Sequence, residues 1–452
     1  MLNMYKKNII RGKCVDISSE GKGVIKTVYG VIFVDSLLLG EEAEIEITYA
    51  GKGVSYGVIK KLLTFSKDRI TPKCPISTAC GGCVFQNATY EYELRYKKHK
   101  VEEALKRIGH LENIKVNDVI GMDNPEHYRN KIQVPFGREN KRVIYGFYKS
   151  KTHKIIPVKE CNIEDQKSAQ ILQNIAFLME KMRIDPYNED RRTGVIRHVL
   201  IRTSLTTDEV MVVLVCNVDT FPGRNNFVKE LVKLSPNVST VVYNVNKRDT
   251  NVILGEKEKV LYGKGFITDE ILGLNFNISS QSFYQVNPIQ VQKLYGLALQ
   301  YANLNKDDVV LDAYAGVATI GLLASKYVKK VTSVELSKSA VINARNNASL
   351  NNIRNIEIIE DDCTDYINRE FPHFDVVIMD PPRKGSTPEF LNAIKKIKPS
   401  RLVYISCEPS TLSRDLEILK DTYNVEIVQP VDMFPRSYHV ETICALSFKG
   451  QM

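Results

Sequence analysis

The spacing of hydrophobic and polar residues changes along the chain, and each pattern predicts a different kind of fold. Residues 1–62 contain short apolar runs separated by glycines, such as GVIFVDSL and EEAEIEITYA, and they show no helical period. Short, evenly spaced strands of this kind are typical of small closed β-barrels. We therefore predict a barrel of about five strands here, serving either as a binding module or as a structural cap.

Residues 63–289 combine one strong helical pattern with a series of strands. The stretch TYEYELRYKKHKVEEALKRIGH has helical periodicity, and Thr89 and Gly109 stand where the helix would begin and end. From residue 128 onward, runs such as YRNKIQVPFG, GVIRHVLIRTS and EVMVVLVCN predict strands. This mixture predicts an α+β domain in which antiparallel pairs dominate. The basic residues that we assign to the exposed face of the helix are Arg95, Lys97, Lys98, Lys100, Lys106 and Arg107.

The pattern changes again in residues 290–452. Strands such as DVVLDAYAG and KVTSVEL alternate with helices such as ATIGLLASKY and SAVINARNNASLN. This alternation predicts an α/β fold with a doubly wound, Rossmann-like parallel sheet, in which ligands bind at the carboxyl ends of the strands. The closing segment VEIVQPVDMFPRSYHVETICALSFK adds two strands, which we expect to form a hairpin at the sheet edge.

The charge of the chain points to a polyanionic partner. Its 62 Lys and Arg residues exceed its 53 Asp and Glu residues, which gives a formal net charge of +9. Basic side chains that neutralise phosphates release counterions, although a basic solvated surface is the alternative reading. The basic residues that we predict to contact such a partner are Lys52, Lys60 and Lys61 on the barrel, Arg129 and Lys131 in YRNK, and Arg197, His198 and Arg202 in IRHVLIR.

The sequence shows neither a membrane segment nor a secretion signal. Its first residues, MLNMYKKNIIRGKC, are charged, and it contains no run of about 18 apolar residues. We therefore expect a cytoplasmic protein that has no membrane partner.

Carboxylates end the second, third and fourth predicted strands of the C-terminal segment. Glu335 ends VTSVE, Asp361 and Asp362 follow IEIIE, and Asp380 ends VVIMD. A carboxylate at such a position can accept the ribose hydroxyls of a nucleotide-like cofactor, or it can simply cap the next helix. The turn AGVATIG lacks the GxGxxG spacing of dinucleotide sites. The pattern therefore favours S-adenosylmethionine over a dinucleotide.

One cysteine cluster stands out among the nine cysteines. The stretch CPISTACGGC places Cys74, Cys80 and Cys83 in a C-x5-C-x2-C spacing, and VKECNIED supplies Cys161 as a distant fourth thiol. Four thiolates can hold either a tetrahedral zinc ion or a 4Fe-4S cluster. Three close cysteines and one distant cysteine favour the cluster, because zinc ribbons usually use two CxxC pairs.

A different cysteine, Cys407, ends a predicted strand in YISCEPSTLSRD and directly precedes a helix. We expect the positive end of that helix to lower the pKa of the thiol and to favour a nucleophilic thiolate. The remaining cysteines are interpreted as buried structural thiols, namely Cys14, Cys216, Cys363 and Cys444.

Four ordered motifs, SSQSFYQVN, DPPRKG, SCEPSTLSRDL and DMFPRSYHVE, resemble those of the bacterial RNA uracil-C5 methyltransferases. The similarity spans the whole chain and is greatest to the iron-sulfur enzymes that act on 23S ribosomal RNA and carry an N-terminal TRAM domain. Two departures stand out. Ala315 and Ala318 replace the cysteine and the second glycine of the family's YCGxGT turn, and Glu408 follows Cys407 where asparagine is common.

The resemblance implies covalent methylation of carbon 5 of a uridine. Cys407 would be the nucleophile that adds to carbon 6, and Glu441, two residues after His439, would be the general base that removes the carbon 5 proton. Arg383 would lie near a phosphate or the uracil carbonyls. The implied contacts to S-adenosylmethionine are Gln281, Tyr314, Glu335 and Asp380, with Asp362 beside the adenine, and the implied ligands of a 4Fe-4S cluster are Cys74, Cys80, Cys83 and Cys161.

Taken together, these patterns predict a monomer of three domains: a TRAM-like barrel over residues 1–62, an RNA-binding domain with the iron-sulfur site over 63–289, and a methyltransferase domain over 290–452. Two alternatives to 23S ribosomal RNA methylation stay open, namely uridine methylation in the tRNA T-loop and a non-catalytic RNA-binding iron-sulfur protein. A DNA cytosine methyltransferase would carry a Pro-Cys pair after its fourth strand, where this chain has DPPR.

Overall fold

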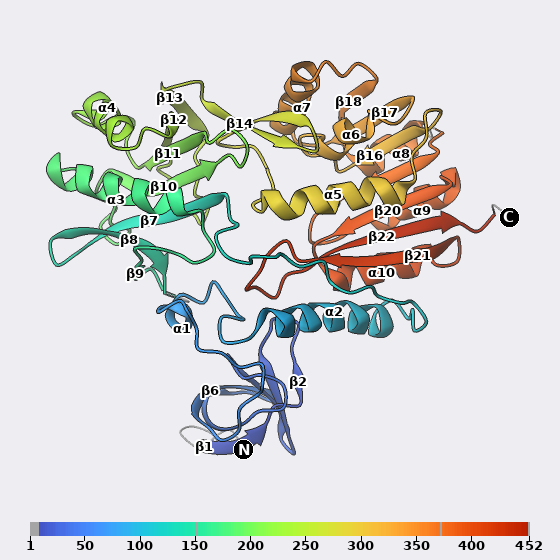
Figure 1. Ribbon diagram of the computed structural model, residues 1–452, viewed down its shortest axis with the longest axis horizontal. Coiled ribbons are helices and arrows are strands. Elements are labelled where there is room, and N and C mark those ends of the chain that lie inside the picture. The colour runs from blue at the N-terminus through green and yellow to red at the C-terminus, as the bar shows by residue number, and fades with distance from the viewer. Residues whose placement is uncertain (1–8, 150–151, 371–372, 451–452) are drawn as a thin grey trace.

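The computed structural model describes residues 9–149, 152–370 and 373–450. Figure 1 shows a small β-rich unit at the N-terminal end, a long helix (α2) lying above it, and two larger α/β units side by side above that helix. Residues 1–8 of the predicted barrel lie outside the described residues. Within the described residues, no helix is long and apolar enough to cross a membrane.

The N-terminal unit is a curled six-stranded sheet, one strand more than predicted. Along β5 the side chains alternate, with Ala43, Ile45 and Ile47 in the core and the glutamates between them turned outward. Cys14 lies in this core, as expected of a structural thiol. The strands follow the order β1-β5-β6-β4-β3-β2 and are β1 (Ile9–Lys13), β2 (Asp16–Ile17), β3 (Gly23–Thr27), β4 (Gly30–Val34), β5 (Glu42–Ala50) and β6 (Gly53–Leu62).

A short helix, α1 (Ser77–Cys80), and the long helix α2 (Tyr90–Arg107) follow the barrel. Thr89 caps α2, as predicted, since its side chain accepts a hydrogen bond from the backbone N–H of Tyr92. The predicted exposed face is wrong at Lys97, which is completely buried. Its burial has a structural reason, because Lys97 forms ion pairs with Glu93 of the same helix and with Asp432 from the other end of the chain.

The central unit is an α+β fold in which antiparallel pairs dominate, as predicted. Its seven-stranded sheet has the order β13-β12-β11-β10-β7-β8-β9, and only β11 and β12 pair in parallel. Helices α3 and α4 cover one face. The elements are β7 (Lys131–Glu139), β8 (Arg142–Tyr148), β9 (Ile155–Pro157), α3 (Gln166–Lys181), β10 (Ile196–Thr203), β11 (Val210–Cys216), α4 (Arg224–Leu234), β12 (Val238–Val245) and β13 (Lys257–Tyr262), with a separate hairpin β14 (Phe266–Ile271) and β15 (Leu274–Ser279).

The basic residues of β10 do not form the exposed patch that we predicted. Arg197, His198 and Arg202 are all buried, because β10 is a central strand between β7 and β11 and both of its faces are covered. The guanidinium of Arg197 donates to the backbone carbonyls of Asn246 and Arg248. The guanidinium of Arg202 likewise donates to the carbonyl of Ser282, whereas the buried Nδ1 of His198 has no hydrogen-bond partner among the described residues.

The C-terminal unit confirms the predicted doubly wound sheet. Its strands have the order β18-β17-β16-β19-β20-β22-β21, so the winding direction reverses between β16 and β19. The predicted closing hairpin is present, with β22 antiparallel to both β20 and β21. The strands are β16 (Val309–Ala313), β17 (Lys330–Glu335), β18 (Ile356–Glu360), β19 (Val376–Met379), β20 (Arg401–Ser406), β21 (Tyr423–Val431) and β22 (Glu441–Phe448).

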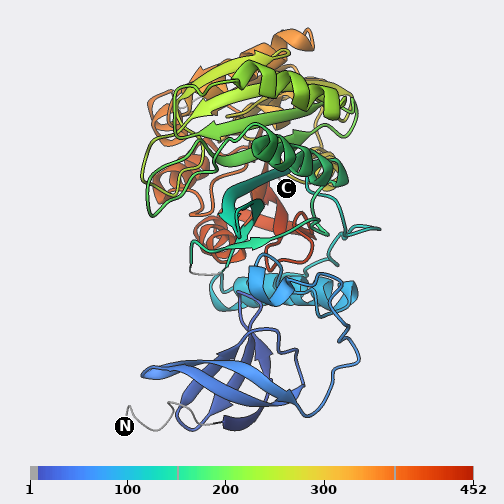
Figure 2. The same ribbon diagram turned by 90° about the vertical axis from the view of Figure 1, so that its left-hand side faces the viewer.

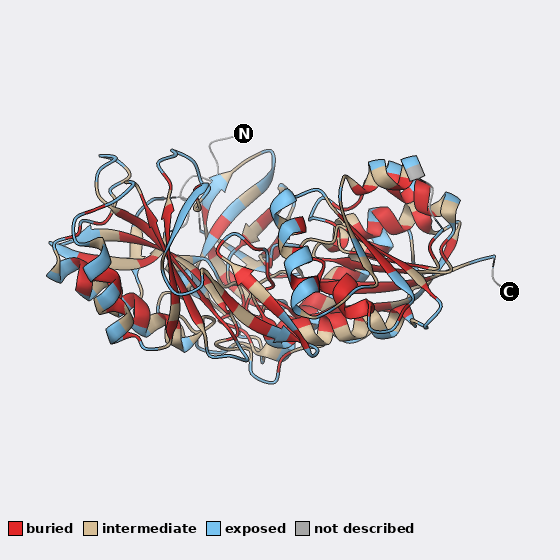
Figure 3. Ribbon diagram, turned by 90° about the horizontal axis from the view of Figure 1, so that it is seen from above, coloured by how far each residue is buried: buried red, intermediate tan, exposed pale blue. Residues whose placement is uncertain are grey.

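Helices cover both faces of this sheet, and its central strands β16, β19, β20 and β22 are almost continuously buried, whereas the edge strand β18 is not (Figure 3). One apolar core joins the two larger units, since Leu200 and Val213 of the central sheet pack in the same cluster as Val291 and Val310. These shared apolar contacts hold the two larger units against each other. The helices are α5 (Pro288–Ala302), α6 (Thr319–Ala324), α7 (Lys338–Leu350), α8 (Cys363–Glu370), α9 (Pro388–Ile397) and α10 (Pro409–Leu419).

Candidate active site

The carboxyl ends of neighbouring strands bring the candidate residues together. Register pairs align the ends of β16, β17 and β19, since Ala313 lies opposite both Val334 and Met379. Directly after these aligned positions come Tyr314, Glu335 and Asp380. The next strand, β20, pairs with β19 through Tyr404 opposite Met379 and runs two residues further, so that Cys407 follows its last residue, Ser406.

Strand β22 adds a fifth candidate residue, Glu441, because it runs antiparallel to β20 and begins at this edge of the sheet. Ser406, the last residue of β20, lies opposite Thr442, so Cys407 and Glu441 stand at the same end of two paired strands. A cavity of about 690 Å³ opens at this edge. The candidate residues that line it are Gln281, Tyr314, Glu335, Asp362, Asp380, Arg383, Cys407, His439 and Glu441.

The turn after β16 shapes one end of the cavity. Its backbone is strained, because Tyr314 and Ala318 both adopt left-handed conformations, with φ of 60° and 56°. The Glu335 carboxylate accepts hydrogen bonds from the backbone N–H groups of Gly316 and Ser337, at 2.9 and 2.8 Å. A Cβ atom on Gly316 would meet nothing within 4 Å, so the backbone here faces open space. This open, acid-lined turn fits the nucleoside part of S-adenosylmethionine.

Two carboxyl groups at the other end of the cavity hold protons more tightly than usual. Burial, together with the neighbouring Asp380, raises the pKa of Glu441 to about 8, while Arg383 opposes the rise. Burial and Asp312 likewise raise the pKa of Asp380 to about 7. At neutral pH the free protein therefore keeps most of the Glu441 population protonated.

The pKa of Cys407 moves in the direction opposite to our prediction. Burial raises it to about 12, and the carboxyl groups of Glu441 and Asp380 add to the rise. The helix that follows does not reverse this effect, since Glu408 caps α10 and its carboxylate accepts hydrogen bonds from the N–H and the hydroxyl of Ser410. The free protein therefore holds Cys407 as a neutral thiol.

Two glutamines of the SSQSFYQVN motif line the cavity in different ways. The amide of Gln281 donates to the carbonyl of Gly255 and to Glu258, so it is engaged with the central unit. Gln285, four residues later, is buried at the cavity wall and interacts with Tyr295. We did not single out Gln285 from the sequence, although it lies in the same motif.

A buried ionic cluster holds the segment between β21 and β22 that leads to Glu441. The Lys97 ammonium donates to Glu93 and Asp432, at 2.6 Å each, and to the carbonyl of Phe434 at 3.1 Å. Glu93 also accepts the backbone N–H of Arg436 at 2.7 Å. Burial alone would lower the pKa of Lys97, but Asp432 and Glu93 outweigh it and raise that pKa. Lys97 therefore remains charged and fixes residues 432–436.

The same segment contacts residues 74–83, which carry Cys74, Cys80 and Cys83 and which we call the cysteine loop. The carbonyl of Arg436 accepts the N–H of Val84, which directly follows Cys83, at 2.7 Å. Tyr128 donates its hydroxyl to the carbonyl of Pro435 at 3.1 Å. Phe434 and His439 of this segment line the cavity. The wall of the site thus depends on contacts from α2, the cysteine loop and the start of the central unit.

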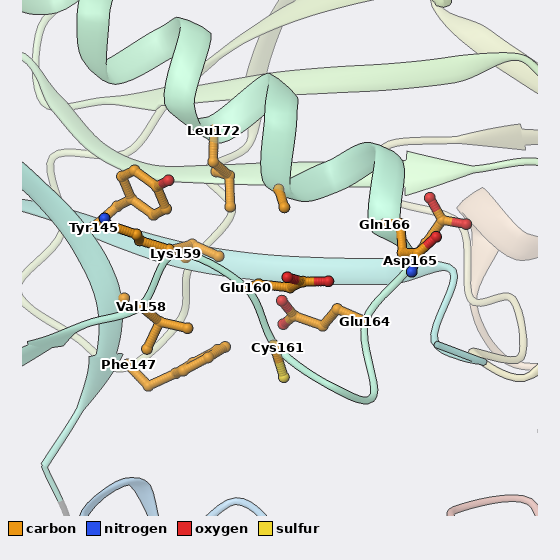
Figure 4. A pocket seen from close by; sticks show the side chains of 13 residues that line it. Tyr145, Phe147, Val158, Lys159, Glu160, Cys161, Glu164, Asp165, Gln166 and Leu172 are labelled. Carbon is orange, nitrogen blue, oxygen red and sulfur yellow. The ribbon is translucent and has the colours of Figure 1, made fainter. Parts of the chain in front are cut away.

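The four clustered cysteines come from two separate segments. Burial raises the pKa of Cys83 to about 11 and that of Cys161 to about 12. Charge on Cys80 and Cys74 adds to the rise at Cys83, and charge on Glu164 and Cys83 adds to the rise at Cys161. Figure 4 shows Cys161 on the loop before α3, with its sulfur turned away from that helix and Glu164 beside it. Within the described residues, no three Cys, His, Asp or Glu side chains meet closely enough to hold a single metal ion.

The doubly wound sheet, with a large acid-lined cavity at the carboxyl ends of its strands, defines an α/β S-adenosylmethionine-dependent methyltransferase fold. Residues 89–449 match the sequence model of the tRNA (uracil-5-)-methyltransferase family. The match covers more than half of the chain, and the chain therefore belongs to this family of RNA methyltransferases.

Relatives and a solved structure agree with this assignment. The chain is 39% identical over 443 residues to an RNA methyltransferase described as uncharacterized from Oceanobacillus iheyensis, covering 96% of this chain and 95% of the relative. A Clostridium tetani relative with the same description is 40% identical over 438 residues, with the same two shares covered. The crystal structure of Pyrococcus abyssi tRNA (uracil-54, C5)-methyltransferase with S-adenosyl-L-homocysteine superposes with a TM-score of 0.79 and 25% identity, over 97% of this chain and 100% of that chain.

The raised pKa of Glu441 predicts how stability depends on pH. The folded protein takes up a proton at Glu441 that the unfolded chain releases at its ordinary pKa of 4.5, so stability falls as pH rises from about 4.5 to about 8. Glu441→Gln removes this loss. Relative to the wild type, the unfolding free energy of the variant should therefore be a few kcal/mol larger at pH 8 than at pH 5, since one pKa unit corresponds to about 1.4 kcal/mol. Urea unfolding of both proteins at the two pH values measures the difference. Exposed Glu112→Gln is the control, and an equal effect in both variants would contradict the assignment.

The ionic cluster predicts an unequal effect of two neighbouring lysines. Lys97→Met leaves Glu93 and Asp432 buried without their cation, which should cost about 3–5 kcal/mol of unfolding free energy. Lys98→Met removes only a surface pair with Asp118 and should cost less than about 1 kcal/mol. Denaturant unfolding compares the two variants. Adding Asp432→Asn to Lys97→Met should recover part of the loss, and equal losses for Lys97→Met and Lys98→Met would show that the cluster does not hold this segment.

Proposed function

We propose that this protein uses S-adenosylmethionine to methylate carbon 5 of a uridine in 23S ribosomal RNA through a covalent bond to Cys407. The observation that supports this proposal most strongly is the meeting of Cys407, Asp380 and Glu441 at adjacent strand ends in one cavity. A protein that only bound RNA would need no half-buried thiol beside two carboxyl groups at this position. The non-catalytic alternative is therefore disfavoured.

The chemistry follows from the weak nucleophilicity of uracil carbon 5. Cys407 and Glu441, which are protonated in the free protein, first have to release their protons to water. The Cys407 thiolate then adds to carbon 6, which forms a sulfur–carbon bond and leaves an enolate whose carbon 5 is electron-rich. When bound, S-adenosylmethionine supplies an electrophilic methyl group that carbon 5 can take up. Glu441 then accepts the proton from carbon 5, the carbon 5–carbon 6 double bond reforms, and the sulfur–carbon bond breaks to release the thiolate.

The residues of the cavity would divide into a cofactor end and a base end. We assign cofactor contacts to Tyr314, Glu335 and Asp380, with Asp362 at the adenine and with Gln281 or its cavity neighbour Gln285. Arg383 lowers the pKa values of both Cys407 and Glu441, which suits a cation that helps both groups to lose their protons. Because one chain supplies all of these residues, we propose that it acts as a monomer.

The RNA target has two candidates. The resemblance to iron-sulfur enzymes and the large central unit favour 23S ribosomal RNA, with Arg129 and Lys131 as phosphate contacts. The superposition on a Pyrococcus abyssi tRNA (uracil-54, C5)-methyltransferase favours a tRNA uridine as the second candidate. In either RNA, the target base has to leave its stack to reach the cavity.

We further propose that Cys74, Cys80, Cys83 and Cys161 hold a 4Fe-4S cluster. This proposal rests on the sequence, in which three close cysteines and one distant cysteine suit a cubane better than a zinc ribbon with two CxxC pairs. In a cubane each thiolate binds its own iron atom. The cluster would tie the cysteine loop to the central unit, and the domain limits would then be residues 1–62 for a TRAM-like barrel, 63–289 and 290–452.

The proposed reaction predicts which RNA accepts a labelled methyl group from S-adenosylmethionine. Wild-type protein should transfer methyl groups to RNA from cells that lack the gene, and nucleoside analysis should find 5-methyluridine in the 23S fraction. Cys407→Ala should lose at least about a thousandfold in rate, because no adduct can activate carbon 5. Label in tRNA alone would replace the ribosomal target with the second candidate. Equal incorporation by wild type and Cys407→Ala would refute the covalent mechanism.

The iron-sulfur proposal predicts the metal content of the protein. Anaerobically purified wild type should be brown, contain iron and sulfide, and bleach on reduction, whereas Cys161→Ser should lose most of the iron. Cys216→Ala is the matched control, because Cys216 is buried in the apolar core of the central unit and is not one of the four proposed iron ligands. A colourless protein that contains stoichiometric zinc would overturn the assignment.

A further inference from the structure

The barrel carries an exposed row of aromatic rings that the proposed reaction does not use. Tyr49 on β5, Tyr56 on β6 and Phe33 on β4 lie side by side, because Tyr56 is in register with both of the others across three adjacent strands. Ring centroids are 6.0 Å apart for Tyr49 and Tyr56 and 5.8 Å apart for Phe33 and Tyr56. We call these three residues the aromatic row.

This row faces solvent. Tyr49 is 60% exposed and Tyr56 is 42% exposed, and beside them Val54 and Val58 of β6 are also exposed. The opposite faces of these strands fill the barrel core, where Ile32 and Ile45 are buried. Cross-strand ring pairs stabilise a sheet, but this stabilisation does not explain why Val54 and Val58 beside the rings are also left exposed.

The charges around the row select the partner. Lys26 is in register with Val31, which itself pairs with Val54, so a lysine ends the exposed stripe on the β3 side. Lys52 lies in the turn between β5 and β6. Among the residues that the structure describes, neither lysine forms an ion pair. Lys60 and Lys22 lie nearby and are paired with Glu46 and Asp35. Rings flanked by free cations suit a phosphate chain with flat bases better than they suit an apolar protein surface.

The barrel is fixed to the catalytic part of the chain. The hydroxyl of Tyr92 accepts the N–H of Leu39, and the hydroxyl of Tyr96 donates to the carbonyl of Ser18, so two tyrosines of α2 hold barrel loops. Arg69 forms a buried pair with Glu41. Figure 2 shows the barrel below α2, joined to the larger units through that helix. An RNA held on the barrel is thus held in a fixed relation to the active site.

We infer that the aromatic row is a stacking platform for an unpaired RNA segment outside the target uridine, with Lys26 and Lys52 contacting its phosphates. Base stacking on exposed rings is tolerant of sequence, so the platform would add affinity rather than choose the methylated base. This inference rests on the proposed function only in taking RNA as the substrate, because the row lies outside the cavity of Cys407.

The absence of tryptophan from the chain allows a direct test. Tyr56→Trp introduces a single indole into the row, and Tyr262→Trp places one at a similarly exposed position on β13 of the central unit. Adding a single-stranded oligouridylate of about ten nucleotides should quench the fluorescence of Tyr56→Trp as bases stack on the indole. The fluorescence of Tyr262→Trp should not change, and equal quenching or no quenching in the two variants would overturn the inference.

A second comparison separates this platform from the reaction itself. Tyr49→Ser with Tyr56→Ser should weaken binding of the oligouridylate at least about fivefold, whereas binding of S-adenosylhomocysteine and the kcat on saturating RNA should stay at the wild-type level. Lys26→Ala should instead reduce the slope of log affinity against log salt by about one. Unchanged RNA affinity in the tyrosine variant, with normal methylation, would refute the platform and leave the reaction intact. Quenching without any methyl transfer would support the platform and refute the reaction. A wild-type dimer that the tyrosine variant dissociates would assign the row to a second copy.

Discussion

Backbone hydrogen bonding between parallel strands is the constraint on which the candidate site depends. The ladders that align Ala313 with Val334 and with Met379 end together, so the following residues leave the sheet at one edge. A parallel sheet covered by helices on both faces cannot slip by one residue without exposing its apolar side chains. The register that buries the core therefore also fixes where Asp380 and Cys407 stand.

Sequence patterns predicted the parts of the site that end apolar runs. Runs rich in β-branched residues, such as VTSV and VVIM, predict strands, and the carboxylate directly after each run marks the strand end, which is why Glu335 and Asp380 could be predicted. The pairing of β22 with β20 was not visible, because the motif around Glu441 indicates only a hairpin with β21. Helical periodicity placed Lys97 on a polar face, but it could not reveal that this face meets Asp432, 335 residues away.

The position of Cys407 explains why its predicted pKa shift failed. The prediction counted only the helix that follows, whereas the folded chain adds burial and two carboxyl groups from other strands, and these raise the pKa to about 12. A neutral, half-buried thiol reacts slowly with oxidants and with stray electrophiles, because the thiolate is the reactive form. The free protein thus protects the sulfur at the expense of its nucleophilicity. In the proposed mechanism, the thiol has to lose its proton only when the target uracil lies in the cavity.

Helix α2 connects the parts of the molecule that would handle RNA. One end of its buried face holds barrel loops through Tyr92 and Tyr96, and Lys97, one residue further, binds the segment that leads to Glu441. Directional hydrogen bonds to buried charges fix position more narrowly than apolar contacts do, because a displaced partner leaves a buried charge unpaired. The position of the barrel relative to the candidate cavity therefore depends on polar contacts of this helix, together with the Arg69–Glu41 pair and the apolar cluster of Leu38, Phe85 and Tyr96.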